Sequence, residues 1–133
     1  MSDSALRSVA VTDGLRVEVE AHFSREHSRP AQNVWFFLYK IRITNEGSDT
    51  CQLESRHWIV RNATGKVEEV RGRGVVGEQP VLGPGESFEY TSGCPLDTPM
   101  GSMEGSYRMV SEAGTAFDIA IARFDLREPG ALH

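Results

Sequence analysis

The stretch of sequence that decides the fold is Leu15–Phe23, LRVEVEAHF, in which apolar and polar residues alternate without a break. In a β-strand successive side chains point to opposite faces, so this order places the apolar set on one face and the charged set in water. An α-helix would scatter both sets around its circumference. The stretch therefore predicts a half-buried β-strand.

Similar patterns recur on both sides of this strand. Val34–Thr44 is apolar on both faces in its first half, which predicts a central strand, and Asn45–Asp49 supplies the Asn, Gly and Asp of a turn. Asn62–Gly65 predicts the tight connection of a hairpin. The remaining candidate strands are Gln52–Val60, Lys66–Val70, Glu86–Ser92, Gly105–Val110 and Ala116–Phe124.

About seven short strands, with no helical-period segment of ten residues, predict an all-β antiparallel sandwich of the immunoglobulin-like type. A closed barrel is the alternative, because the sequence does not say which strands meet at the edges. The 133 residues predict a single domain, 1–133, with a core from about residue 9 to residue 126. We expect Glu26–Asn33 to be a mobile loop and residues 127–133 to be a frayed tail.

Composition excludes several classes of function. The net charge of −5 argues against nucleic acid as a partner on bulk charge. The most apolar stretch, Val34–Ile43, contains two charges and is about half as long as a membrane span, so no membrane insertion is expected. The first ten residues do not resemble a signal peptide, so we expect a cytoplasmic protein in which Cys51 and Cys94 are free thiols, with a disulfide as the alternative. Neither cysteine has metal-ligand spacing, and no metal site is predicted.

One motif has a named chemistry, because Gly72–Gly77 reads GRGVVG and fits the dinucleotide-binding pattern GxGxxG. In that fold the motif seats the pyrophosphate on the amino terminus of a helix, and Pro80 and Pro84 exclude a helix here. A candidate phosphate loop remains. In it the backbone at Gly72, Gly74 and Gly77 binds a phosphate together with the guanidinium groups of Arg71 and Arg73. The competing interpretation, which the sequence favours, is a bent loop in which the glycines serve conformation only.

Arg56 precedes His57 and Trp58 in a predicted strand, so Arg56 and Trp58 share a face. Arg56 would support the phosphate loop if it lies near Arg71 or Arg73; its alternative role is packing against an aromatic ring. No GxSxG, HExxH, P-loop or EF-hand pattern occurs. We therefore expect no enzyme, no catalytic residues and no cofactor.

Two segments rich in aromatic residues, small residues and Met, Ser87–Leu96 and Gly101–Met109, are candidates for a recognition surface. For Phe88, Tyr107 and Met109 the sequence favours ordinary core positions.

Several of these stretches together resemble the ApaG family, also called CorD. The resemblance runs from about Val9 to Leu126 and is carried by HWIV at 57–60, Gly65, VRGRGVVGEQP at 70–80, LGPG at 82–85, FEYTSG at 88–93 and GSMEGSY at 101–107.

This resemblance implies a fibronectin type III-like β-sandwich and a bacterial cytoplasmic protein associated with cobalt resistance and magnesium efflux. Eukaryotic relatives carry the domain inside F-box proteins and a DNA-polymerase-interacting protein, which favours a binding module with an unidentified protein partner. The family's GxGxxG, discussed as a pyrophosphate or nucleotide site, maps onto Gly72, Gly74 and Gly77. The sequence offers no oxygen cage or soft ligand cluster, so we expect any effect on cations to be indirect.

Overall fold

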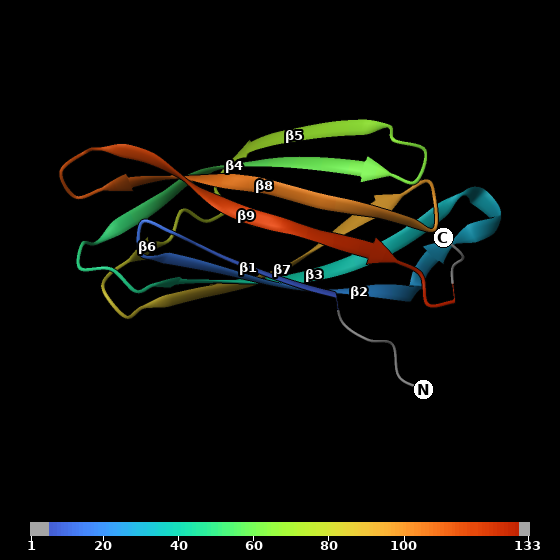
Figure 1. Cartoon of the computed structure of the whole chain (residues 1–133), viewed down its shortest axis with the longest axis horizontal. Helices are drawn as coiled ribbons and strands as arrows, with labels where there is room; N and C mark the ends of the chain where they lie inside the picture. Colours follow the sequence, from blue (N-terminus) through green and yellow to red (C-terminus); the bar gives the residue numbers. More distant parts are fainter. Residues whose placement is uncertain (1–5, 131–133) are drawn as a thin grey trace.

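Two antiparallel β-sheets pack face to face as the two layers of a sandwich (Figure 1). The computed structural model describes residues 6–130, in nine strands and one 3₁₀ turn, η1 (Pro30–Gln32). Sheet A has the order β1 (Leu6–Thr12), β2 (Leu15–Arg29), β3 (Val34–Asn45), β7 (Ser87–Leu96). Sheet B has the order β5 (Val67–Arg73), β4 (Cys51–Asn62), β8 (Met100–Ser111), β9 (Ala116–Arg127), and β6 (Val81–Leu82) pairs with the start of β4. The predicted all-β antiparallel sandwich is confirmed, with more strands than seven.

The two sheets meet along one side, where β1 lies beside β9. The Ser8 hydroxyl donates to the carbonyl of Ala122 at 2.8 Å, and the Ala120 amide donates to the Thr12 hydroxyl at 3.1 Å. These bonds involve side chains, and no backbone ladder joins β1 to β9 in residues 6–130. The closed-barrel alternative is therefore wrong.

The sequence analysis did not predict β1, because its apolar pattern is inverted. The side chains that face β9 are small or polar, such as Ser8 and Thr12, while Val9 and Val11 are exposed. All seven residues of β1 pair with β2 through the backbone. This segment therefore forms a strand because it pairs with β2, and not because it buries an apolar face.

The expected mobile loop at Glu26–Asn33 is in large part a strand, since β2 continues to Arg29. Local hydrogen bonds order this polar segment. The Ser28 hydroxyl donates to the Ser24 carbonyl at 2.5 Å and accepts from the Phe36 amide at 2.9 Å. The His27 ring packs against Phe36 with 5.4 Å between ring centroids. Hydrogen bonds from side chains to the backbone stabilise this part of the strand, which lacks the alternating apolar residues that predict a strand from the sequence.

The expectation of a frayed tail is wrong for residues 127 and 128. Arg127 ends β9, the Glu128 amide donates to the Pro99 carbonyl at 2.9 Å, and Trp35 donates from Nε1 to the Glu128 carboxylate at 3.2 Å. Residues 131–133 lie outside the described residues.

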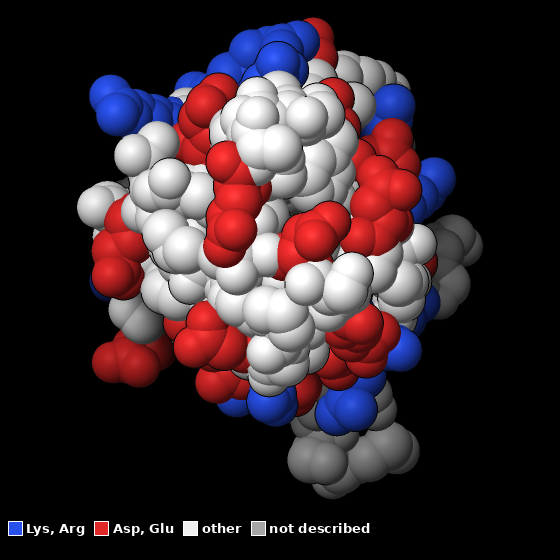
Figure 2. All heavy atoms as spheres, turned by 90° about the vertical axis from the view of Figure 1, so that its left-hand side faces the viewer, with Lys and Arg blue, Asp and Glu red and all other residues white. Residues whose placement is uncertain are grey.

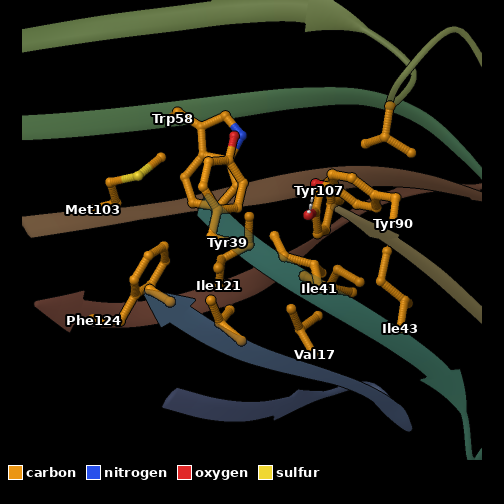
Figure 3. Packing of buried hydrophobic residues seen from close by; sticks show 14 of the residues in the cluster. Val17, Tyr39, Ile41, Ile43, Trp58, Tyr90, Met103, Tyr107, Ile121 and Phe124 are labelled. Carbon is orange, nitrogen blue, oxygen red and sulfur yellow. Dashed lines mark hydrogen bonds between the residues drawn. The ribbon is translucent and has the colours of Figure 1, made fainter. Parts of the chain in front are cut away.

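The core between the sheets is built around aromatic rings (Figure 3). Trp58 of β4 meets Tyr39 of β3 at a centroid distance of 5.4 Å and Phe124 of β9 at 6.0 Å, both near edge-to-face. Tyr107 and Met109 are fully buried, which confirms their predicted core positions, and Phe88 packs partly buried against the same core. Edge-to-face pairs prefer a specific geometry in addition to burying apolar area, so the contacts of Trp58 help to set the relative position of the two sheets.

Both cysteines are free, as predicted, and both are buried. Burial, together with the smaller effect of the Glu68 carboxylate, raises the pKa of the Cys94 thiol to about 11. No helix in the described part of the chain is long and apolar enough to cross a membrane.

Three buried tyrosines lie together between the sheets, and the Tyr90 and Tyr107 hydroxyls share a hydrogen bond. Desolvation by burial raises the pKa of Tyr39, Tyr90 and Tyr107 above the ordinary value near 10, because the phenolate is the form that loses hydration.

This cluster predicts a loss of stability at high pH. A phenol whose pKa is raised in the folded state contributes its full stability below about pH 10, and this contribution is lost as the pH rises above that value. Between pH 10 and its raised folded-state pKa, each such tyrosine should lower the free energy of unfolding by about 1.4 kcal/mol per pH unit. Urea unfolding, followed by Trp fluorescence from pH 8 to pH 11.5, measures how steeply the free energy of unfolding falls with pH. Tyr107→Phe removes one of the three phenols, so the fall should become less steep by about 1.4 kcal/mol per pH unit. A stability that stays flat to pH 11.5 would contradict the prediction.

Candidate functional site

The outer face of sheet B receives its side chains through a bulge in β4. The register with β8 shifts between Leu53 and Ser55, so one extra residue enters β4 at Glu54. Before the bulge Leu53 faces the core, and after it Trp58 faces the core. Ser55 and His57 consequently point outward, because successive side chains of a strand alternate.

Outward side chains of sheet B stand in two rows across the strands. In the first row Arg73 of β5 is opposite Ser55 of β4, which is opposite Arg108 of β8. The second row has the order Arg71, His57, Ser106. Neighbouring strands lie about 4.8 Å apart, so three arginines and a histidine surround two serine hydroxyls within a small area.

These rows line a groove of about 820 Å³ over β4, β5 and β8. The groove also carries two acidic side chains, Glu54 at the bulge and Asp118 on β9, next to Arg108 in the first row. Its donors are therefore densest on the β5 and β4 side, where Arg71, Arg73 and His57 lie. Hydrogen-bond donors and positive charge gathered in one hollow suit an anionic ligand.

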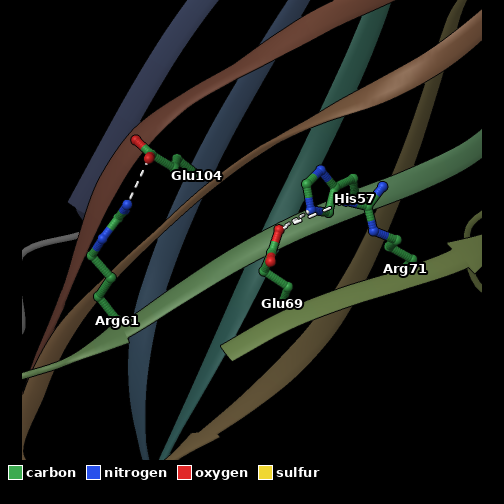
Figure 4. Close-up of polar contacts among 5 residues, drawn as sticks. All are labelled: His57, Arg61, Glu69, Arg71 and Glu104. Carbon is green, nitrogen blue, oxygen red and sulfur yellow. Dashed lines mark hydrogen bonds and ion pairs between the residues drawn. The ribbon is translucent and has the colours of Figure 1, made fainter. Parts of the chain in front are cut away.

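Ion pairs hold part of this charge in place (Figure 4). The Glu69 carboxylate lies 2.8 Å from Nε2 of His57 and 3.8 Å from the Arg71 guanidinium. Arg108 lies 3.6 Å from Glu54. Arg73 has a different contact, a 3.5 Å hydrogen bond to the side-chain oxygen of Gln79. These exposed pairs are weak, and a ligand that offers stronger acceptors can replace them.

The Gly72–Gly77 motif forms the end of β5 and a two-residue hairpin. Val75 and Glu78 exchange two backbone hydrogen bonds of 2.8 Å across Val76 and Gly77, which have φ angles of +43° and +81°. Positive φ at both central residues is the type I′ hairpin geometry. No helix follows the motif within the described residues, which agrees with the sequence argument against a dinucleotide fold.

Two glycines of the motif lie in close contacts, and the one at Gly74 requires a glycine. Gly74 has φ +65°, and a Cβ there would lie 2.3 Å from the Glu78 carbonyl oxygen. Gly72 is opposite Arg56 on β4, and a Cβ at Gly72 would lie 2.6 Å from Nη2 of Arg56. The glycine leaves the space that the Arg56 guanidinium occupies.

Arg56 borders the groove, but its guanidinium binds the protein itself. Nη1 donates to the carbonyls of Arg73 at 3.1 Å and Gly74 at 2.8 Å. Arg56 shares the inward face of β4 with Trp58, and its positive charge lowers the pKa of the buried Tyr90, against the larger effect of burial. Arg56 therefore holds the end of β5 from the inner face of sheet B, while the side chains of Arg71 and Arg73 lie on its outer face.

Of the residues predicted from the motif, the structure brings Arg71 and Arg73 into the groove. Gly72, Gly74 and Gly77 shape the backbone beneath them, and Arg56 supports that backbone from the inside. Sequence reasoning missed Ser55, and it included Ser106 and Arg108 only within the candidate recognition segment Gly101–Met109, without joining them to the glycine motif. Only the strand register brings these residues together on one face of the sheet.

Acidic side chains predominate at another part of the surface. Figure 2 shows Asp and Glu surrounding the end of the sandwich on the left of Figure 1, where the β3–β4 and β8–β9 turns lie. Within residues 6–130, no three His, Cys, Asp or Glu side chains are placed to hold one metal ion.

Known proteins resemble this chain over most of its length. The family model described as ApaG domain matches residues 25–111. Protein ApaG of Methylobacterium sp. (strain 4-46) is 53% identical over 120 residues, which cover 90% of this chain and 92% of that protein. Protein ApaG of Bradyrhizobium sp. (strain BTAi1) is 55% identical with the same coverage. A crystal structure from Bordetella pertussis superimposes with a TM-score of 0.84 at 51% identity, covering 88% of this chain and 95% of that one.

The contact between Gly72 and Arg56 predicts a measurable coupling. Gly72→Ala should displace the Arg56 guanidinium from its two carbonyl acceptors and cost about 1.5–3 kcal/mol of unfolding free energy. In an Arg56→Ala background the same substitution should cost less than about 1 kcal/mol, because nothing remains to be displaced. Urea unfolding of the four proteins completes the cycle. Equal costs in both backgrounds would show that Gly72 does not serve Arg56.

Proposed function

The chain belongs to the ApaG family, and on that premise we propose that it is a non-enzymatic binding domain whose groove on sheet B receives a phosphate-bearing ligand. The observation that carries this proposal is the double row of outward side chains. Arg73, Ser55 and Arg108 lie across three neighbouring strands, with Arg71 and His57 beside them. The arrangement offers donors from separate strands to one anion.

The chemistry of these side chains matches phosphate. A guanidinium group donates two parallel hydrogen bonds to phosphate oxygens, and such charge-assisted bonds are stronger than neutral ones. Serine hydroxyls between the arginines add donors that carry no charge. Arg73 contributes most directly, because its contact to Gln79 is long and neutral and is readily exchanged for an anion.

The proposed binding groups are side chains, because most amides of the glycine loop already have partners. The amides of Gly74, Val75 and Glu78 already donate to backbone carbonyls within the protein. The loop therefore acts by holding β5 and its two arginines beside β4. The volume of about 820 Å³ lies within the range of small-ligand sites. With the anion-binding side chains that line it, the ligand class that we propose is a small phosphoanhydride such as pyrophosphate or a nucleotide.

The cellular role is proposed from the same family. The association with cobalt resistance and magnesium efflux would follow indirectly, through a bound phosphate compound or an unidentified protein partner in the cytoplasm. No sequence pattern of a recognised catalytic site accompanies the groove.

Calorimetric titration with pyrophosphate tests the proposed ligand class. Arg73→Ala should weaken binding by about 10- to 100-fold, the loss expected for charge-assisted hydrogen bonds. Arg123→Ala is the matched control, since it removes the same charge from an exposed position on β9 outside the groove and should leave affinity unchanged.

Three results would contradict the proposal. Wild-type protein that shows no saturable heat up to millimolar pyrophosphate would remove the ligand class. Equal losses in Arg73→Ala and Arg123→Ala would show that bulk charge, and not the groove, attracts the anion. Release of inorganic phosphate that depends on Arg73 would overturn the non-enzymatic part.

A further inference from the structure

β5 is the outermost strand of sheet B, and its outer edge faces solvent (Figure 1). In the described part of the chain β5 pairs with β4 alone, over seven residues without a bulge. Every residue of the strand except Gly72 is exposed. An edge strand that is straight and unbulged is a template for pairing with another strand.

The backbone groups available at this edge follow from the hairpin bonds at either end. The Asn62 amide donates to Lys66, and the Gly74 amide donates to Glu54, so residues 66 and 74 face β4. Because antiparallel ladders alternate, residues 68, 70 and 72 also face β4. The amide and carbonyl groups of Val67, Glu69, Arg71 and Arg73 therefore point toward the free edge.

We propose that the partner of this edge is β5 of a second copy of the chain, antiparallel to the first, with a two-fold axis at Val70. In this register Glu69 is directly opposite Arg71 of the other copy, and Arg71 is opposite its Glu69. All these residues have outward-pointing backbone groups, so each opposite pair exchanges two backbone hydrogen bonds. Opposite charges directly across a sheet are stabilising.

Other symmetric registers are disfavoured by charge. An axis at Glu69 places two carboxylates opposite each other, and an axis at Arg71 places two guanidinium groups opposite each other. An axis at Gly72 sets Arg71 against Arg73. Like charges directly opposite are destabilising, so the sequence VEEVRGR selects the Val70 register.

The inner face of β5 gives independent support. Val70 points toward the space between the sheets, as does its partner Trp58, yet it is 44% exposed. In the proposed pair the two Val70 side chains meet at the axis and shield each other. The ten-stranded sheet that results carries both grooves on one face.

A single pair of strands buries less area than the interfaces of stable complexes, so the dimer should be weak and concentration-dependent. Sedimentation velocity over a concentration series should show a monomer–dimer equilibrium for the wild-type chain. Glu69→Arg and Arg71→Glu should each raise the dimer dissociation constant by about tenfold or more, since each sets like charges opposite one another twice.

Mixing these two variants gives the sharpest test. Arg at position 69 of one variant faces Glu at position 71 of the other, and the remaining pair is Arg71 with Glu69, so an equimolar mixture should dimerise although neither component does. The double variant Glu69→Arg with Arg71→Glu should dimerise as the wild type does. The matched controls are Arg123→Glu and Asp125→Arg, which carry the same charge changes on β9. Both keep the wild-type β5, so each should dimerise as the wild type does, alone and in the mixture.

Amide hydrogen exchange identifies the interface. Raising the protein concentration should slow exchange at residues 67, 69, 71 and 73 and leave residues 68, 70 and 72 unchanged, because these already bond to β4. The proposal is overturned if the wild type stays monomeric to millimolar concentration, if the mixture stays monomeric, or if new protection falls on another strand such as β7. Loss of dimerisation in Arg123→Glu or Asp125→Arg alone would show that net charge, and not the charge order along β5, governs association, and would overturn it as well.

Discussion

One extra residue in β4 is the constraint on which the core and the groove both depend. Cys51 and Leu53 face the core before the bulge at Glu54, and Trp58 and Val60 face it afterwards. A regular strand would place Trp58 on the outside if Leu53 were inside. The bulge lets both face sheet A, and it sends Ser55 and His57 to the outer face.

The same shift divides the arginines between two tasks. Arg56 falls on the inner face, where its guanidinium fills the space over Gly72 and binds the carbonyls at the end of β5. Arg71 and Arg73 fall on the outer face, beside the serines of β4 and β8. The glycine motif is thus the backbone support for a site made of side chains.

Period-two alternation predicted most of the fold, since it identified the central strands, the β4–β5 hairpin and the sandwich. It missed β1, whose exposed valines invert the pattern, and the end of β2, which side-chain hydrogen bonds order. Of the groove, the sequence supplied Arg71 and Arg73 through the glycine motif. Arg108 was part of the candidate recognition segment Gly101–Met109, but its place in the same groove could not be predicted, because it is 35 residues or more from both in the chain and only strand register brings it near.

An amide-resolved NMR titration of the wild-type chain with pyrophosphate tests the central claim most directly. The account predicts saturable shifts at Ser55, His57 and Ser106, across the floor of the groove, together with Arg71 and Arg73 at its wall. Shifts confined to Val76 and Gly77 at the hairpin tip would contradict it, because they would place the ligand on the glycine loop. Unchanged spectra up to millimolar pyrophosphate would show that the groove does not bind this class of ligand.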